Sequence, residues 1–96
     1  MPAIIELKVT DRMKARGVLY SALQREYKLL KMSIDRTEQN ISSFESKYNL
    51  SSQNFLKVRP KMGDDPDFID WYGEIRILDA LNTEVAQITE ILEQCR

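Results

Sequence analysis

The chain has 96 residues, of which 43% are hydrophobic and 30% are charged; this is typical of one small folded domain and too apolar for a disordered tail. It contains no histidine, the commonest general base and metal ligand, and a single cysteine, Cys95, which excludes an internal disulfide and fits a reducing compartment. The start of the chain lacks the pattern of a signal peptide, and no apolar run approaches the roughly 18 residues of a membrane span. We therefore expect a cytoplasmic protein that is not an enzyme, needs no cofactor and contacts no membrane.

The formal net charge of −1 is unevenly spread along the chain. Residues 1–36 have a net charge of +4, residues 37–62 of +2, and residues 63–96 of −7. A basic first half and an acidic second half attract each other if the chain folds back on itself. We favour this intramolecular interpretation over a nucleic-acid-binding patch, because nucleic-acid-binding domains normally show a higher pI and a recognisable reading motif.

Residues 1–10 are interpreted as a short strand or as the frayed start of a helix. Within residues 3–9 the apolar side chains of Ile5, Leu7 and Val9 alternate with charged ones, as in a half-exposed strand. A lone strand has no hydrogen-bonding partner within this chain, so it would need another copy or another protein.

Residues 11–48 show the hydrophobic periodicity of one long helix, with Asp11 near its start. Two apolar columns repeat with alternating spacings of three and four, which is typical of a coiled-coil seam or the buried stripe of a bundle helix. The first column is Tyr20, Tyr27, Ile34, Ile41 and Tyr48, and the second is Leu23, Leu30, Thr37 and Phe44. Gly17 costs about 1 kcal/mol in a helix interior, so a break or fray near it stays an open alternative to one continuous helix.

Residues 49–65 form the predicted connection. Asn49 suits the left-handed conformation that follows a helix, and Ser51 or Ser52 suits the N-cap of a short helix. The segment Val58-Arg59-Pro60 is expected to end that helix, because proline restricts the residue before it.

A second long helix is predicted over residues 66–95. Asp64 or Asp65 caps it, and Pro66 occupies the first helical position, where a missing N–H costs nothing. Its apolar columns, widened by Phe68 and Ile75, are Trp71, Leu78, Val85 and Leu92, and Leu81, Ile88 and Cys95. We therefore expect an all-α, single-domain protein spanning residues 1–96, built as a long helical hairpin or coiled coil and dimerised into a four-helix bundle.

The acids at the start of the second helix invite a metal-site interpretation. Asp64, Asp65, Asp67 and Asp70 nevertheless lack the alternating spacing and distal glutamate of a calcium loop, and helix capping explains them without a metal. We expect no metal site here.

The aromatic residues around this helix start are the candidate partner-binding residues: Phe55, Phe68, Trp71 and Tyr72. One interpretation is that they cover the end of the hairpin core. The other is that they anchor a protein partner, because aromatic side chains dominate interface energetics and a two-helix hairpin has little core in which to bury them.

The stretch Lys-Tyr-Asn-Leu-Ser-Ser-Gln-Asn-Phe at 47–55, followed by Gly-Asp-Asp-Pro-Asp-Phe-Ile-Asp-Trp-Tyr at 63–72, resembles a group of small prokaryotic proteins with a KYG-MSSEEF … GDD-DFxEWY pattern. That group is associated with toxin–antitoxin operons as the antitoxin-like member. The resemblance covers roughly residues 40–80. This chain has Asn49 where the group has glycine, and Gln53 and Asn54 where it has acids.

This resemblance implies a non-enzymatic, antitoxin-like module that binds and neutralises a small toxin protein, whereas the expected self-association follows from the apolar seam. Two alternatives stay open. The first is a structural coiled-coil adaptor or prefoldin-like chaperone subunit that uses the seam for assembly. The second is a nucleic-acid-binding regulator that uses the basic first helix.

Overall fold

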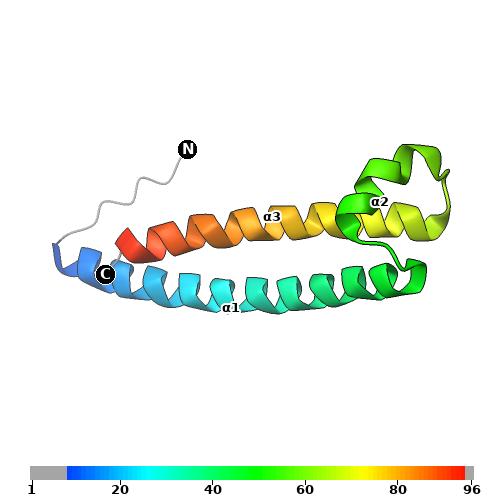
Figure 1. Ribbon diagram of the computed structural model, residues 1–96. Coiled ribbons are helices and arrows are strands. Elements are labelled where there is room, and N and C mark those ends of the chain that lie inside the picture. The colour runs from blue at the N-terminus through cyan, green and yellow to red at the C-terminus, as the bar shows by residue number, and fades with distance from the viewer. Residues whose placement is uncertain (1–8, 95–96) are drawn as a thin grey trace.

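The computed structural model describes residues 9–94, and every regular element within them is a helix. Helix α1 spans Val9–Tyr48, α2 spans Ser52–Val58, the 3₁₀ helix η1 spans Arg59–Lys61, and α3 spans Pro66–Gln94. Helices α1 and α3 run antiparallel and pack as a hairpin, with α2 and η1 in the connection between them (Figure 1). The all-α helical hairpin is thus confirmed.

The two ends of the chain bear on two predictions. Most of the predicted N-terminal strand, and the position of Cys95 on the second column, lie outside the described residues. Val9 is described and begins α1, so the helix starts two residues before the predicted boundary. Helix α1 continues without interruption through Gly17, as the prediction of one long helix requires, and the alternative of a break there does not occur. Thirty-nine other residues in the same 40-residue helix outweigh the cost of one glycine.

The end of α1 is set by backbone geometry at two residues. Asn49 has a φ of 49°, the left-handed conformation predicted for it. The N–H of Leu50 then donates to the carbonyl oxygen of Glu45 at 3.1 Å, which is the six-to-one hydrogen bond of a Schellman motif. The chain therefore leaves α1 in a sharp turn rather than by fraying.

Helix α2 begins at a paired cap. The side chain of Ser51 accepts a hydrogen bond from the N–H of Asn54 at 3.2 Å, as predicted. The carboxylate of Glu45 in α1 accepts the N–H of Ser52 at 2.7 Å, which ties the start of α2 to the preceding helix. These two acceptors satisfy N–H groups that a short helix leaves unpaired.

The short helix ends within the predicted Val58-Arg59-Pro60 segment, since α2 stops at Val58 and Arg59 is its C-cap. The 3₁₀ helix that follows was not predicted. The chain tightens from α2 into η1, and Pro60 lies within the first turn of the new helix. In that position no N–H of proline is needed, so the ring is tolerated. Gly63, with a φ of +82°, then turns the chain toward α3.

The start of α3 agrees with the prediction. A carboxylate oxygen of Asp65 accepts the N–H of Asp67 at 2.9 Å, and its backbone oxygen accepts the N–H of Phe68 at 2.9 Å. Pro66 is the first helical residue. Asp65, rather than Asp64, is therefore the cap.

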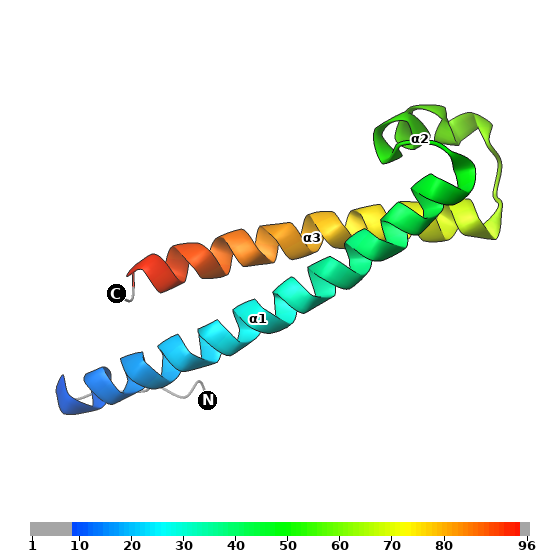
Figure 2. The same ribbon diagram turned by 60° about the horizontal axis from the view of Figure 1, so that its bottom comes forward.

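The predicted apolar columns form the contact between the helices, since every member within the described residues is buried or half-buried. Burial is uneven along the hairpin. On α1 the buried members are Leu30, Ile34, Thr37 and Ile41, whereas on α3 only Trp71 is buried and the later members are half-exposed. Figure 2 shows α1 and α3 crossing near α2 and separating toward the opposite end.

None of the helices within residues 9–94 combines the length and apolarity that a membrane crossing requires.

Candidate functional site

Five aromatic rings from three helices meet where α2 covers the hairpin, and we call them the aromatic cluster: Phe44, Tyr48, Phe55, Phe68 and Trp71. Its centre is the stack of Phe55 on Trp71, with ring centroids 3.9 Å apart and planes 4° from parallel. Both side chains are 0% exposed. The stack therefore attaches α2 firmly to the first turns of α3.

The remaining contacts of the aromatic cluster join α1 to this stack. The rings of Phe44 and Tyr48 lie 5.9 and 6.0 Å from the Trp71 ring. Phe68 lies 5.2 Å from Tyr48 and 6.0 Å from Phe55. The indole N–H of Trp71 donates to the hydroxyl of Ser52 at 3.0 Å, which satisfies its buried donor. All three α-helices are thus locked together at one end of the molecule, which we call the tip.

A polar contact supports the same packing. One carboxylate oxygen of Asp67 accepts hydrogen bonds from the ammonium of Lys47 and the hydroxyl of Tyr48, each at 2.5 Å. The hydrogen bonds from Lys47 and then Tyr48 lower the pKa of the Asp67 carboxyl. The hydrogen bond to Asp67 raises the pKa of Lys47 and of Tyr48. Asp67, predicted only to oppose the helix dipole, therefore also links α3 to α1.

The four candidate partner-binding residues separate into two pairs. Phe55 and Trp71 belong to the interior, so their role in this conformation is to hold the tip together. Phe68 and Tyr72 are half-buried and present part of their surface. The structure thus favours the core interpretation for the first pair and leaves the second pair within reach of a partner.

Tyr72 is held between two arginines. The guanidinium of Arg59 lies 3.7 Å from the centroid of the Tyr72 ring, and Nη1 of Arg76 donates to the Tyr72 hydroxyl at 3.3 Å. The hydrogen bond from Arg76 lowers the pKa of Tyr72. Sequence reasoning missed both arginines. The spacing of four between Tyr72 and Arg76 was a usable signal, but the approach of Arg59 depends on the path of the connection.

Beside this arrangement lies a small cleft of about 130 Å³ between η1 and the start of α3. Its lining includes Arg59, Phe68 and Ile69, and the Ile69 side chain is 57% exposed. We call Arg59, Phe68, Ile69 and Tyr72 the tip surface. It combines exposed apolar area with guanidinium donors, so it can bury an apolar side chain and donate hydrogen bonds to a carboxylate or carbonyl of a partner.

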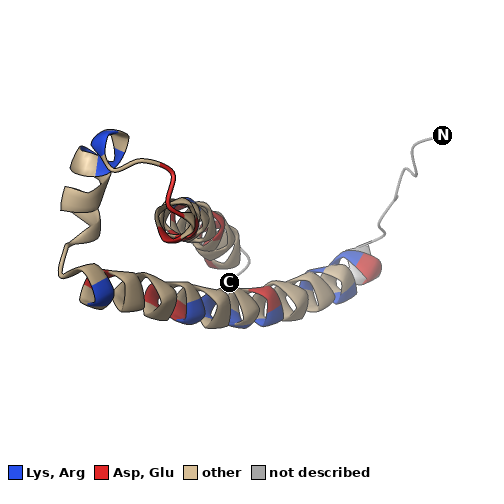
Figure 3. Cartoon of the chain, turned by 90° about the vertical axis from the view of Figure 1, so that its right-hand side faces the viewer, with Lys and Arg blue, Asp and Glu red and all other residues tan. Residues whose placement is uncertain are grey.

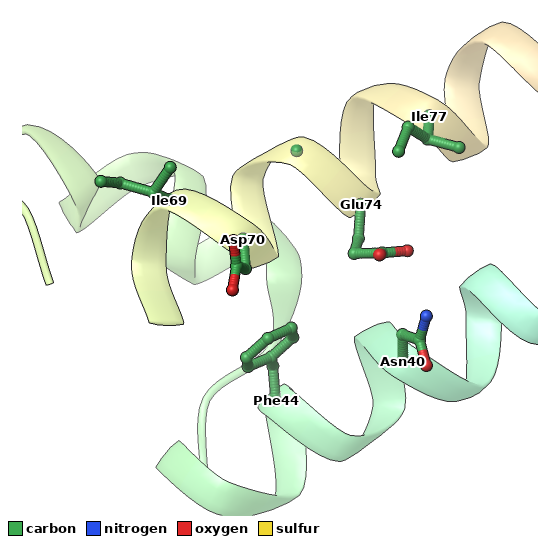
Figure 4. Close-up of a pocket in the computed structure, with 7 residues that line it drawn as sticks. Asn40, Phe44, Ile69, Asp70, Glu74 and Ile77 are labelled. Carbon is green, nitrogen blue, oxygen red and sulfur yellow. The ribbon is translucent and has the colours of Figure 1, made fainter. Parts of the chain in front are cut away.

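A longer groove of about 490 Å³ lies along one side of the hairpin, between α1 and α3. In Figure 4, Phe44 rises from α1 toward α3, while Asn40 of α1 and Glu74 of α3 face one another across the groove, next to Ile77. Gly73 also lines it, so the backbone of α3 is accessible there. This groove marks the side on which the seam between the helices is open.

The search for metal ligands and the comparisons with known proteins identify no further site. Within the part of the chain that the structure describes, no group of three or more His, Cys, Asp or Glu side chains could hold a metal ion. No family model, curated protein or solved structure matches the chain. The resemblance to antitoxin-like proteins therefore stays a prediction.

Proposed function

We propose that this protein is a non-enzymatic, antitoxin-like interaction module that binds and neutralises a small toxin protein through the tip surface. The observation that carries the proposal is the position of Ile69, 57% exposed, beside the Arg59–Tyr72 pair. Tyrosine and arginine are over-represented among residues that dominate binding energy, and an exposed apolar side chain next to them gives the interface a centre.

The rigidity of the tip supports the same proposal. The aromatic cluster and the Asp67 contacts fix the helix turn that carries Ile69 and Tyr72 before any partner arrives. A surface ordered in advance loses less conformational entropy on binding, which raises affinity without new contacts. The buried pair Phe55 and Trp71 thus contributes to binding by positioning the tip surface.

The resemblance noted in the sequence is located at the same end. The two similar stretches, 47–55 and 63–72, contain the end of α1, the start of α2 and the first turns of α3. These stretches contain most of the aromatic cluster. They also contain three of the four residues of the tip surface. This coincidence supports an antitoxin-like role.

A growth assay tests the proposal. The product of the reading frame next to this gene is expressed under an inducible promoter in a bacterial host, with and without this protein. We expect the neighbouring product to arrest growth and the wild-type protein to restore it. We expect the double variant Ile69→Ser, Tyr72→Ala to lose most of this protection while retaining a helical circular-dichroism spectrum.

The matched control is Met32→Ser, because Met32 is 61% exposed on α1 and far along the chain from the tip surface. It should protect as well as wild type. A neighbouring product that is harmless, or one whose toxicity the wild-type protein does not relieve, would contradict the antitoxin proposal. Full protection by the double variant would contradict the tip surface as the binding site.

A second candidate function is that of a structural coiled-coil adaptor or prefoldin-like subunit, and one observation favours it. Helix α1 exposes large apolar side chains away from the tip, namely Met13, Val18, Leu19, Leu29 and Met32. We propose that the hairpin self-associates into a dimeric four-helix bundle. Sedimentation distinguishes the candidates: an assembly larger than a dimer that forms without a toxin favours the adaptor, and a dimer that captures one favours the antitoxin.

A further inference from the structure

The groove of Figure 4 identifies one side of the hairpin, and helical spacing extends that side along both helices. On α1, steps of three, four and seven residues backward from Asn40 lead to Ser33, Leu29, Ala22 and Leu19. On α3, the same steps forward from Gly73 lead to Ile77, Ala80, Glu84 and Ile91. These residues therefore form one continuous side of the hairpin.

This side is apolar and uncovered. Leu19 and Leu29 on α1 are 51% and 57% exposed, and Ile77 and Ile91 on α3 are 49% and 42% exposed. We call these four residues the uncovered face. Small side chains lie on the same side, including Gly73 and Ala80, and they let another helix approach closely.

The opposite side of the hairpin is different in character. The groove there, of about 290 Å³, is lined by Tyr20, Tyr27 and Leu92 together with the polar side chains of Gln24, Lys28, Thr89 and Glu93. Within residues 9–94, only the side of the uncovered face exposes large aliphatic side chains from both long helices. A face that pairs with its own copy through a twofold axis forms a closed pair rather than an open filament.

Charge indicates what covers the uncovered face. Helix α1 carries eight basic and five acidic side chains, whereas α3 carries one basic and seven acidic side chains. Figure 3 shows basic positions along α1 with acidic ones among them, and acidic positions on α3 and the segment that leads into it. A second copy of this chain brings an acidic helix to each basic one only if α1 lies against α3 of the partner copy.

We propose that two copies pack through the uncovered face, with α1 of each copy against α3 of the other and both tips at the same end. A twofold axis parallel to the helices produces this arrangement. A twofold axis perpendicular to the helices would instead place the acidic α3 helices of the two copies against each other. The arrangement also makes every pair of neighbouring helices antiparallel, as in simple four-helix bundles.

The size of the molecule is sufficient for such a contact. The hairpin measures 59 × 29 × 17 Å, so its broad side exceeds the roughly 800 Å² per partner that stable interfaces bury. Packing a second hairpin there would also cover the half-exposed members of the α3 columns, such as Leu81 and Ile88. The inference deepens the self-association proposed above and does not depend on the toxin.

Sedimentation equilibrium of the full chain tests whether the uncovered face is the dimer interface. We expect a dimer whose dissociation constant rises about 100-fold in Ile91→Ser, because the lost burial counts once in each copy. Leu56→Ser is the matched control, since Leu56 in α2 has the same 42% exposure and lies outside the uncovered face. A monomeric wild-type protein, or equal effects of the two substitutions, would overturn the proposal.

The distance between the two tips tests the arrangement. In a Cys95→Ser background, a spin label at Gln53→Cys in α2 reports this distance by pulsed electron resonance. We expect a separation well below the 59 Å length of the molecule, and a dimer that weakens as salt screens the contact between α1 and α3. A separation near or beyond that length would overturn the parallel arrangement.

These results separate this inference from the proposed function. Tyr72 belongs to the tip surface and does not line the groove of Figure 4, so Tyr72→Ala alone should leave the dissociation constant unchanged. A dimer that forms as described beside a failed growth assay rejects only the antitoxin role. Protection by a monomeric protein rejects only the dimer.

Discussion

The tip and the opposite end of this hairpin, which we call the open end, bury their apolar side chains to different extents. At the tip, α2 adds a third element, and two aromatic side chains become 0% exposed. Along the rest of α3 only α1 is available, and residues with the same periodicity, such as Leu81 and Val85, are half-exposed. Two packed helices leave the edges of their apolar stripes exposed. A third element or a second chain is needed to cover those edges.

The largest effect is expected from removing the ring at the centre of the tip. Trp71→Ala deletes the ring that Phe44, Tyr48 and Phe55 pack against. We expect a loss of about 3–5 kcal/mol in the free energy of unfolding, a large part of the stability of a small domain. Urea titration followed by circular dichroism measures it. A change below about 1 kcal/mol would show that the aromatic cluster is not the core.

The matched substitution at the open end is Leu81→Ala. Because Leu81 is only half-buried within one chain, we expect a smaller loss of about 1–2 kcal/mol at concentrations where the protein is monomeric. The loss should grow as the protein concentration rises, if a second copy covers this side chain. An effect as large as that of Trp71→Ala, independent of concentration, would contradict the difference between the two regions.

A stabilising change of about 1 kcal/mol or less is expected from Gly17→Ala. Gly17 lies inside α1 near its start, and a methyl group added there meets no atom within 4 Å. Alanine restricts the unfolded chain and favours the helix, so the free energy of unfolding should rise. Thermal denaturation monitored by circular dichroism gives the sign. A destabilised variant would indicate that this part of α1 is not helical in solution.

The smallest effect concerns the polar contact at the tip. The pKa of Asp67 is lowered from 3.8, so the folded state binds its proton less tightly than the unfolded state. The stabilisation is therefore present above pH 3.8 and is lost as the pH falls through the lower pKa of the folded protein. Asp67→Asn should remove this part of the acid dependence in urea titrations at a series of pH values. Unchanged acid dependence would exclude the contact as its source.

The same contact predicts a second dependence of stability on pH, in the alkaline range. The pKa of Lys47 is raised above 10.5 by the same contact, so its stabilising contribution is complete below that pH and is lost as the pH rises through the higher pKa of the folded protein. Lys47→Met keeps the aliphatic stem and removes the charge. It should flatten the alkaline decline without altering the aromatic cluster.

Local signals in the sequence determined the secondary structure well. Asn49, Ser51 and Asp65 act as the end and starts of helices because capping involves only the next few backbone groups. The apolar columns gave the facing sides of both long helices, because a period of 3.5 residues leaves little choice of which side is buried. The 3₁₀ helix η1, which contains Pro60, was not predicted, because it depends on how the connection packs.

Tertiary structure alone decided the roles of the aromatic residues. By sequence, Phe55, Phe68, Trp71 and Tyr72 were equivalent candidates for partner contact. The fold of the connection places α2 over the start of α3, and this buries Phe55 and Trp71 while leaving part of Phe68 and Tyr72 exposed. It also brings Arg59 onto the Tyr72 ring from 13 residues away. Burial depends on contacts between distant segments, which no local pattern specifies.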